Sequence, residues 1–260
     1  MQDIEIVHED EDIIVCYKPA GLAVQSNSVT IPDLESLLRS KLVRSAGKSA
    51  VIHVVHRLDQ PVEGLVVFAK NREAAASLSR QVQEKGEMSK EYKAVVFGGF
   101  PEDMKKGELV DFIGKDASTG SAVIVKESEA EEKHKQGLKE ARLIYEVLAE
   151  KTVGLEKIVR FHKQDEASSK DLVDEERKIS LVNIQLKTGR FHQIRAQFQS
   201  VGYPLMGDRR YFSDKSNDLS RELNVRNVAL CAYRVSFRHP KSDEVVTFEI
   251  EPRSELFTKF

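Results

Sequence analysis

Hydrophobic and polar positions alternate along much of the chain, which is the pattern of β-strands. Residues 4–17 alternate in this way on both sides of an acidic run at 9–12, so two short strands are expected there. The apolar, β-branched runs at 51–55, 64–69 and 90–97 predict three more. In the second half of the chain, the same signals predict strands at 141–148, 157–161, 179–186, 228–237 and 245–250.

Apolar residues spaced by three or four positions predict helices in three places. The first helix has Pro32 in its first turn and Thr30 as its cap, the second is capped by Asn71 and ended by Gly86, and the third ends at Gly202. The apolar positions of the first helix are Leu34, Leu37, Leu38 and Leu42. Those of the second are Ala74, Leu78 and Val82, and those of the third are Ile194, Phe198 and Val201.

Strands outnumber helices in this pattern, and short turns join several of them. The arrangement favours an α+β fold built on a mixed, largely antiparallel sheet with flanking helices, rather than a regular alternation of strands and helices. Two charged stretches, 126–140 and 163–177, carry few large apolar side chains and are expected to be solvated loops or frayed helices. Because neither a repeat nor a low-complexity linker interrupts the pattern, a single domain over residues 1–260 is expected.

The composition allows a substantial core, with 40% hydrophobic and 32% charged residues. No apolar run reaches the roughly 18 residues of a membrane span, and the N-terminus lacks the basic start and apolar stretch of a signal peptide. A cytoplasmic protein without a membrane partner is therefore expected. Cys16 and Cys231 lie far apart and show no metal-type spacing, so both are expected to be reduced, buried thiols.

The formal net charge of −2 argues mildly against a nucleic-acid partner, since phosphate contact is largely electrostatic. Binding needs only one basic face, however, so the distribution of charge matters more than the sum. Acidic residues gather in the middle of the chain, whereas basic residues gather at 187–195 and at Arg209 and Arg210. Those basic segments could meet an anionic partner.

The polar segment 56–63 lies between two expected strands and holds a carboxylate, Asp59, near Arg57. A nearby positive charge lowers the pKa of a carboxyl group, which suits an ionised nucleophile or base. A structural ion pair would leave the same pattern. Metal ligation by Asp59 with His53 and His56 is a third interpretation, although His53 falls within an expected strand.

A second polar segment, 186–195, passes from a strand through Thr188 and Gly189 into the third helix. Backbone N–H groups at such a helix start favour an anion, and Arg190 or Arg195 could pair with a phosphate or a carboxylate. An ordinary helix start with solvated basic residues fits as well. No glycine-rich phosphate loop, GxGxxG or GxSxG motif is present, so neither a nucleotide cofactor nor serine hydrolysis is expected.

Taken in order, these segments resemble the RluA-type family of pseudouridine synthases along the whole chain. The first motif is Tyr17-Lys18-Pro19-Ala20-Gly21-Leu22, and the second is His56-Arg57-Leu58-Asp59, followed after four residues by Gly64-Leu65. The third is Lys90-Glu91-Tyr92-Lys93-Ala94, and the fourth runs from Leu186 to Arg195 and continues at 202–208. Phe237-Arg238-His239-Pro240 also fits. Four ordered motifs are far more specific than any one of them.

The resemblance implies the pseudouridine synthase fold, a bent mixed sheet with a central RNA-binding cleft. It implies that Asp59 is the catalytic carboxylate, that Arg195 pairs with Asp59, and that Tyr92 packs on the target uracil. Arg57 would fill the space left by the extruded nucleotide, while Lys187 and Arg190 would contact phosphates. The expected enzyme isomerises a uridine of tRNA or rRNA, works as a monomer, and needs neither a metal nor an organic cofactor.

Two features depart from the family pattern. Many relatives have Arg/Lys-x-Thr/Ala-Ser-Gly after the catalytic aspartate, whereas Gln60-Pro61-Val62-Glu63-Gly64 stands here. Glu63 adds a carboxylate near the site, and we expect it to cap or pair within the loop. Many relatives also carry an N-terminal RNA-binding domain of the ribosomal S4 type, for which no room is expected before the first motif.

A non-catalytic RNA-binding or chaperone protein that retains the cleft is the alternative function, and a metal-dependent hydrolase is a third.

Overall fold

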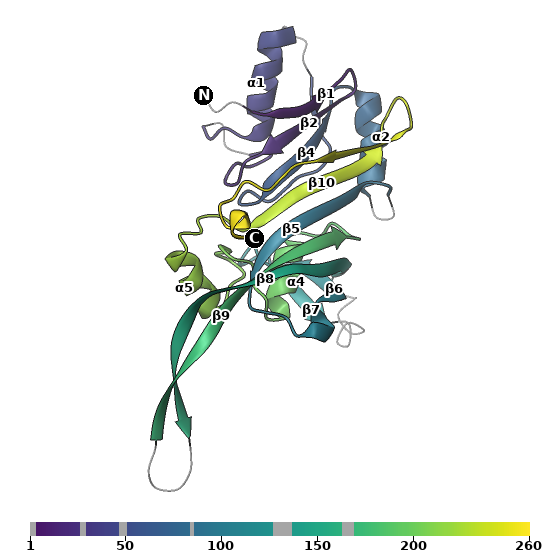
Figure 1. The fold of residues 1–260 in the computed structure, drawn as a ribbon. Helices are drawn as coiled ribbons and strands as arrows, with labels where there is room; N and C mark the ends of the chain where they lie inside the picture. The colour runs from purple at the N-terminus through teal and green to yellow at the C-terminus, as the bar shows by residue number, and fades with distance from the viewer. Residues whose placement is uncertain (1–3, 27–29, 47–50, 84–85, 127–136, 163–168) are drawn as a thin grey trace.

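The computed structural model describes residues 4–26, 30–46, 51–83, 86–126, 137–162 and 169–260, and its core is one bent, 11-stranded sheet (Figure 1). The strands of the first half are β1 (Ile6–Glu9), β2 (Ile13–Lys18), β3 (His53–Val54), β4 (Glu63–Ala69) and β5 (Ser89–Phe97). The later strands are β6 (Lys106–Lys115), β7 (Ala122–Lys126), β8 (Lys139–His162), β9 (Ser169–Leu186), β10 (Leu230–Arg238) and β11 (Val245–Glu249). The helices are α1 (Leu34–Ala46), α2 (Arg72–Val82), α4 (Gln193–Ser200) and α5 (Asp214–Glu222), with short 3₁₀ turns η1 (Glu102–Met104) and η4 (Phe257–Lys259).

The strand order is β1-β2-β4-β10-β5-β9-β8-β6-β7, with β11 beside β10 and β3 beside β4. Among the strand pairs of the described residues, only β4 and β10 run parallel. The expected α+β fold with a mixed, largely antiparallel sheet is therefore confirmed. The predicted strands are present with two differences: the one expected at 51–55 shortens to two residues, and those expected at 141–148 and 157–161 are parts of one continuous strand, β8.

Strand β10 joins the N-terminal strands to the rest of the sheet, because it pairs with β4 on one side and with β5 on the other. In this register, Gly64 lies opposite Ala232, and Ala232 lies opposite Tyr92. Gly64 has φ of 133°, and a Cβ there would approach the backbone N and O of Ala232 to 2.5 Å. Only glycine allows β4 and β10 to pair this closely. Because β10 also pairs with β5, the segment that precedes β4 and the residue Tyr92 on β5 are separated by a single intervening strand.

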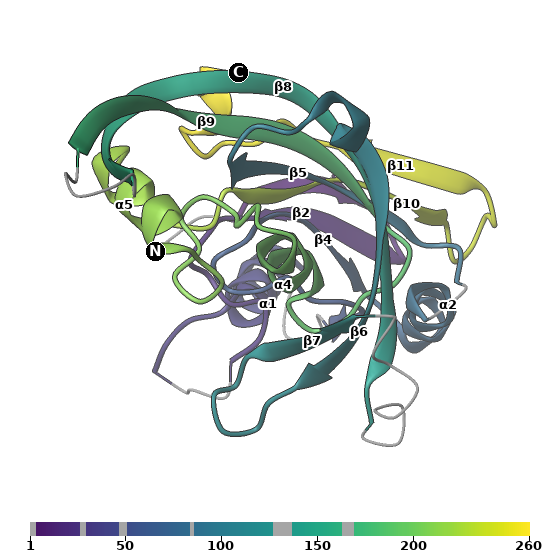
Figure 2. The ribbon, with the colours of Figure 1, turned by 90° about the horizontal axis from the view of Figure 1, so that it is seen from below.

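The helices cover opposite faces of the sheet. The face that carries Tyr92 packs against α1 through Leu34, Leu38 and Leu42, and against α4 through Ile194 and Phe198. The other face packs against α2 and, further along, α5. Strands β8 and β9 curve over α4 (Figure 2), so the sheet wraps around the helix that carries the fourth motif. The first and third helices were predicted from these same apolar positions.

The helix ends correct two expectations. Asn71 does cap α2, since its side chain accepts a hydrogen bond from the N–H of Ala74. The cap of α1 is Asp33 rather than Thr30, because the Asp33 carboxylate accepts from the Ser36 N–H at 2.7 Å. Helix α2 ends at Val82 rather than at Gly86, which lies in the turn that follows. Strands β6 and β7 and helix α5 were not predicted.

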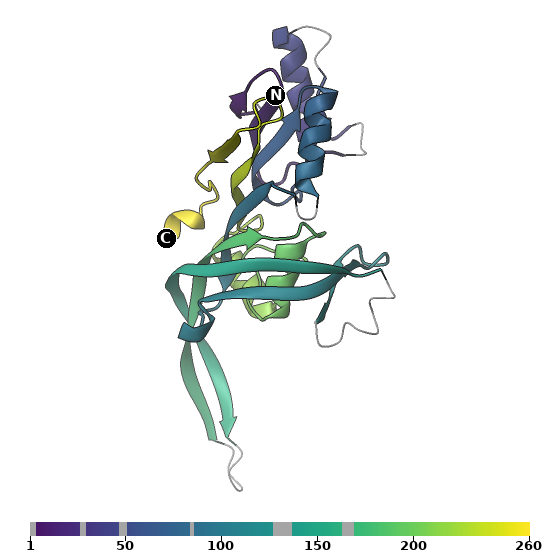
Figure 3. The same cartoon turned by 90° about the vertical axis from the view of Figure 1, so that its right-hand side faces the viewer.

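Charged residues 169–177 form part of β9 rather than a loop, which corrects a further expectation. They pair in register with β8 and extend as a two-stranded ribbon beyond the rest of the sheet (Figures 1 and 3). Residues 127–136 and 163–168 of the two charged stretches lie outside the described residues.

Cys16 and Cys231 are both buried and unpaired, as expected. In the described part of the chain, none of the helices is both long and apolar enough to cross a bilayer.

Candidate active site

Asp59 opens a tight turn that the first motif holds in place. The N–H of Val62 donates to the carbonyl of Asp59 at 3.1 Å, and the flanking side chains of Leu58 and Val62 are buried in the core. Gln60 exchanges hydrogen bonds with Gly21: the Gly21 N–H donates to the Gln60 carbonyl at 2.8 Å, and the Gln60 side-chain amide donates to the Gly21 carbonyl at 3.0 Å. This Asp59 turn, residues 59–62, is thereby anchored at both ends.

Lys18 is a fully buried cation beneath the same turn. Its ammonium group donates to the carbonyls of Pro19, Leu22 and Gln60 at 3.0, 2.7 and 3.1 Å. Burial lowers the pKa of Lys18 to about 7, against the opposing effect of Asp59 and Glu63. The ammonium therefore ties the first motif to the Asp59 turn, and the turn presents the Asp59 carboxylate from a rigid base.

Arg195 lies between two carboxylates. Its Nη1 donates to Asp59 Oδ2 at 2.9 Å, while Nε and Nη2 donate to the two oxygens of Asp208 at 2.7 and 2.9 Å. Burial lowers the pKa of Arg195, but the hydrogen bonds and charge of Asp208 and Asp59 outweigh burial and raise it. The bidentate pair with Asp208 fixes the direction of the guanidinium, so its remaining nitrogen faces Asp59.

Asp59 itself remains reachable, because 26% of its side chain is exposed, whereas Arg195 is 6% exposed and Asp208 is fully buried. The Asp59 carboxylate is therefore paired with Arg195 on one side and accessible from solvent on the other.

His192 is a further neighbour of Asp59, with 3.6 Å between its Nε2 and Asp59 Oδ2. Its Nδ1 lies 2.9 Å from the hydroxyl of Tyr211, and its ring stacks on Phe191. Burial lowers the pKa of His192 to about 4, although Asp59 opposes this shift. The imidazole is therefore neutral at pH 7.

Tyr92 lies on β5 on the α4 side of the sheet, and 6% of it is exposed. Burial raises the pKa of its hydroxyl, and the Asp59 charge raises it further. The phenol thus stays protonated, and the effect of Asp59 on its pKa places the hydroxyl near that carboxylate. The predicted neighbours Tyr92 and Arg195 both lie with Asp59.

Glu63 does not pair within the loop as expected. It is the first residue of β4, is buried, and accepts a hydrogen bond from the Tyr17 hydroxyl at 2.6 Å and others from the N–H groups of Arg253 and Ser254. The C-terminal segment therefore holds this carboxylate. Gln60, the other departure from the family pattern, anchors the Asp59 turn, so neither residue argues for a cleft without catalysis.

The remaining predicted residues lie at the surface around the site. Arg57 is exposed and contributes to an open pocket of about 420 Å³. Lys187 is exposed and Arg190 is partly exposed in the turn before α4; the Lys187 ammonium donates to Gln185, and the Arg190 Nε donates to the carbonyl of Glu140. The pocket is lined by Gln25, Glu35, Ile52, His53, Val54, Val55, His56 and Arg57.

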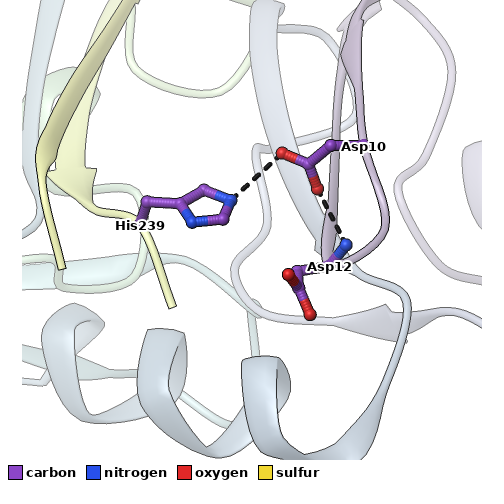
Figure 4. Close-up of side chains that lie close together, drawn as sticks. All are labelled: Asp10, Asp12 and His239. Atoms are coloured by element: carbon purple, nitrogen blue, oxygen red, sulfur yellow. Dashed lines mark hydrogen bonds and ion pairs between the residues drawn. The ribbon is translucent and has the colours of Figure 1, made fainter. Parts of the chain in front are cut away.

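The histidines considered as metal ligands have other surroundings. His56 is buried, and its Nε2 accepts the N–H of Val67 at 3.1 Å. Among the described residues, the group whose ligand atoms lie close enough to share an ion is Asp10, Asp12 and His239 (Figure 4). His239 Nδ1 accepts from two N–H groups of the following turn, so its Nε2 carries the proton and donates to Asp10 at 3.0 Å. This tautomer makes a hydrogen bond rather than a metal bond.

Four contributors to the site were not predicted: Lys18, His192, Asp208 and Tyr211. The first three lie within the segments that carry the family resemblance, so their position in a motif was the available signal. Their contacts depend on pairings between distant segments, such as Lys18 with Gln60, which local patterns do not show.

Comparison with known proteins shows the family to which the chain belongs. The family model described as RNA pseudouridylate synthase matches residues 12–200. An uncharacterized RNA pseudouridine synthase of Aquifex aeolicus is 34% identical over 255 residues, covering 95% of this chain and 69% of that protein. Ribosomal large subunit pseudouridine synthase D of Neisseria meningitidis serogroup B is 30% identical, covering 98% of this chain and 59% of that protein.

Solved structures show the same fold. Human RNA pseudouridylate synthase domain containing 1 aligns with a TM-score of 0.67 at 20% identity, over 96% of this chain and 84% of that one. Human RNA pseudouridylate synthase domain containing 4 aligns with a TM-score of 0.64 at the same identity.

Proposed function

The chain belongs to the RNA pseudouridylate synthase family, and from that premise we propose that Asp59 is the carboxylate that acts on the target uridine. The observation that carries the proposal is the Asp59–Arg195–Asp208 arrangement. It holds a carboxylate on an anchored turn, partly exposed, paired with Arg195 and close enough to Tyr92 to act on its hydroxyl.

The reaction is an isomerisation whose atoms balance within the nucleotide. The bond between ribose C1′ and uracil N1 breaks, a bond from C1′ to uracil C5 forms, C5 loses a proton and N1 gains one. Asp59 supplies the negative charge next to the detaching base, and Arg195 holds that carboxylate in place by a charged hydrogen bond. Tyr92 packs on the uracil while it turns. The residues of the site supply these functions without a metal or organic cofactor.

A uridine inside folded RNA cannot reach Asp59 unless it leaves its stack. We assign Arg57 to the space that the nucleotide vacates, because it is exposed and lies two residues before Asp59. Lys187 and Arg190, which are exposed and partly exposed in the turn before α4, are assigned to phosphates of the RNA. The substrate is a uridine of tRNA or rRNA, bound by a monomer in the cytoplasm, and residues 1–260 form one catalytic domain. The name of the Neisseria relative supports a ribosomal substrate.

The test uses total RNA from cells that lack the gene, labelled with tritium at uracil C5, since forming the C1′–C5 bond releases that hydrogen. Purified protein should release tritium, and Asp59→Asn should abolish the release while the circular dichroism spectrum stays unchanged. Asp218→Asn is the matched control, because Asp218 is exposed on α5. Full activity of Asp59→Asn would refute the role of Asp59. Mapping pseudouridines in parental and deletion cells then identifies the target RNA.

A further inference from the structure

His192 adopts a backbone conformation that needs an explanation. Its φ of 53° lies in the left-handed region, which few non-glycine residues adopt, and it sits at the N-cap of α4 without making a capping hydrogen bond. The other non-glycine residues of the described chain with positive φ are Asn224 and Asp243, which belong with histidine to the types found most often in this region. Such strain persists where the surroundings hold a side chain for a purpose.

Tyr211 determines which nitrogen of His192 carries the proton. The backbone N–H of Ala122 donates to the Tyr211 hydroxyl oxygen at 2.6 Å, and burial raises the pKa of that hydroxyl, so it keeps its proton. The proton of the hydroxyl then points to its other neighbour, His192 Nδ1, 2.9 Å away. A neutral imidazole that accepts at Nδ1 carries its hydrogen on Nε2. The hydrogen of Nε2 therefore lies on the side of Asp59.

The two oxygens of Asp59 have different surroundings. Oδ2 accepts from Arg195 at 2.9 Å and lies 3.6 Å from His192 Nε2, whereas Oδ1 accepts no hydrogen bond that the structure shows from a described residue. The His192 contact is longer than a hydrogen bond, and such contacts commonly shorten when a substrate closes the site. If the distance between His192 Nε2 and Asp59 Oδ2 shortens to that of a hydrogen bond, the carboxylate plane becomes fixed and Oδ1 is directed at the nucleotide.

We propose that His192 is a positioning residue that orients the Asp59 carboxylate through a neutral Nε2–H, with Tyr211 and the β7 backbone fixing its tautomer. The proposal rests on the assignment of Asp59 as the reacting carboxylate. The charged and titratable groups facing His192 are Asp59, Arg195, Arg210, Asp208 and Tyr211. Burial and the two arginines keep the imidazole neutral, so it donates one hydrogen and adds no second cation beside Arg195.

The tautomer can be measured without any reaction. Long-range ¹H–¹⁵N spectra of the protein at pH 7 should show His192 as the Nε2–H form, assigned by loss of its signals in His192→Gln. In Tyr211→Phe, which keeps the ring but removes the hydroxyl, the same signals should shift toward a mixture of tautomers. An Nδ1–H or charged His192 in the unaltered protein would overturn the proposal even if Asp59 is catalytic.

The functional test is single-turnover tritium release from the labelled total RNA with enzyme in excess. His192→Ala should lower the maximal rate about 10-fold, and Tyr211→Phe about 3-fold, while the enzyme concentration for half-maximal rate changes less than about twofold. His192→Gln, whose amide can reach the place of Nε2, should recover part of the loss. An unchanged maximal rate in both His192→Ala and Tyr211→Phe, or a change confined to the half-saturating concentration, would overturn the proposal. If the unaltered protein released no tritium, the proposed function would fail instead, and the spectra would still report the tautomer.

Discussion

The guanidinium of Arg195 lies 2.9 Å from the carboxylate of Asp59, although 136 positions separate the two residues in the chain. Arg195 comes from the first turn of α4 and Asp59 from the turn before β4, so the contact exists only because the sheet brings these segments together. Asp208 completes the arrangement from the opposite side of Arg195. The Asp208 carboxylate is buried and fixes the guanidinium, whereas the Asp59 carboxylate is partly exposed and can be reached from outside.

Replacing Asp208 by Asn should therefore damage the site without touching Asp59. The neutral amide cannot offer two acceptor oxygens to Arg195, so a buried cation loses its main partner. Breaking such a pair costs about 3 kcal/mol or more of the free energy of unfolding. Chemical denaturation should show this loss, and tritium release by the folded protein should fall. A variant as stable and active as the original would contradict the role given to Asp208.

Replacing Glu63 by Gln should lower the stability of the protein but leave its activity nearly unchanged. Its carboxylate serves Tyr17 and the segment at Arg253 and Ser254 rather than the reaction. Loss of these hydrogen bonds to a charged group should lower the free energy of unfolding by about 1–3 kcal/mol. Tritium release at a temperature well below unfolding should stay within about twofold of the original. A loss of activity without a loss of stability would mean that Glu63 acts on Asp59.

Asp10 should make stability depend on pH. Burial raises the pKa of Asp10, but hydrogen bonds from His8, from the N–H groups of Ile13 and Asp12, and from His239 outweigh burial and lower it well below 3.8. The unfolded chain then binds a proton before the folded one as pH falls, so the stabilisation is complete above about pH 4 and is lost at lower pH.

The measurement compares Asp10→Asn with the original chain by chemical denaturation at pH 7 and at pH 3. Asp10 is about one-third exposed, so a difference of about 1 kcal/mol is expected at pH 7 after allowing for solvent screening. The difference should shrink at pH 3. Asp218→Asn serves as the control, and a constant difference across this range would contradict the assignment.

Lys187 and Arg190 should contribute to RNA affinity through charge alone. If each contacts a phosphate, Lys187→Ala and Arg190→Ala should weaken binding to all RNAs alike and lower the slope of log affinity against log salt by about 1. Filter binding of total RNA at several salt concentrations measures the slope. Lys241→Ala, at an exposed lysine in the β10–β11 turn, is the control and should leave the slope unchanged.

The sequence predicted most of the fold because its strands and helices carry regular apolar patterns. Leu34, Leu38, Ile194 and Phe198 are buried as that periodicity required. The prediction was wrong for 169–177, because the charges suggested a loop, whereas pairing with β8 makes a strand of it. No local pattern reveals a partner so far along the chain.

Some residues of the site could be predicted from the sequence, and others could not. Motifs indicated Asp59, Tyr92 and Arg195, and the structure places them together. The contribution of His192 was hidden, because it depends on Tyr211 and on the β7 backbone at Ala122. Helix propensity does not anticipate a histidine with left-handed backbone geometry, since tertiary contacts alone maintain it.

The place of β10 between β4 and β5 has a consequence for how the protein is made. Synthesis runs from the N-terminus, so both neighbours leave the ribosome long before residues 230–238. Until then, β4 and β5 each have an open edge beside the segments of Asp59 and Tyr92, and open edges favour aggregation. The segments of Asp59 and Tyr92 are therefore joined through the sheet only when one of the last strands arrives, and until that moment the growing chain exposes two edges that favour aggregation.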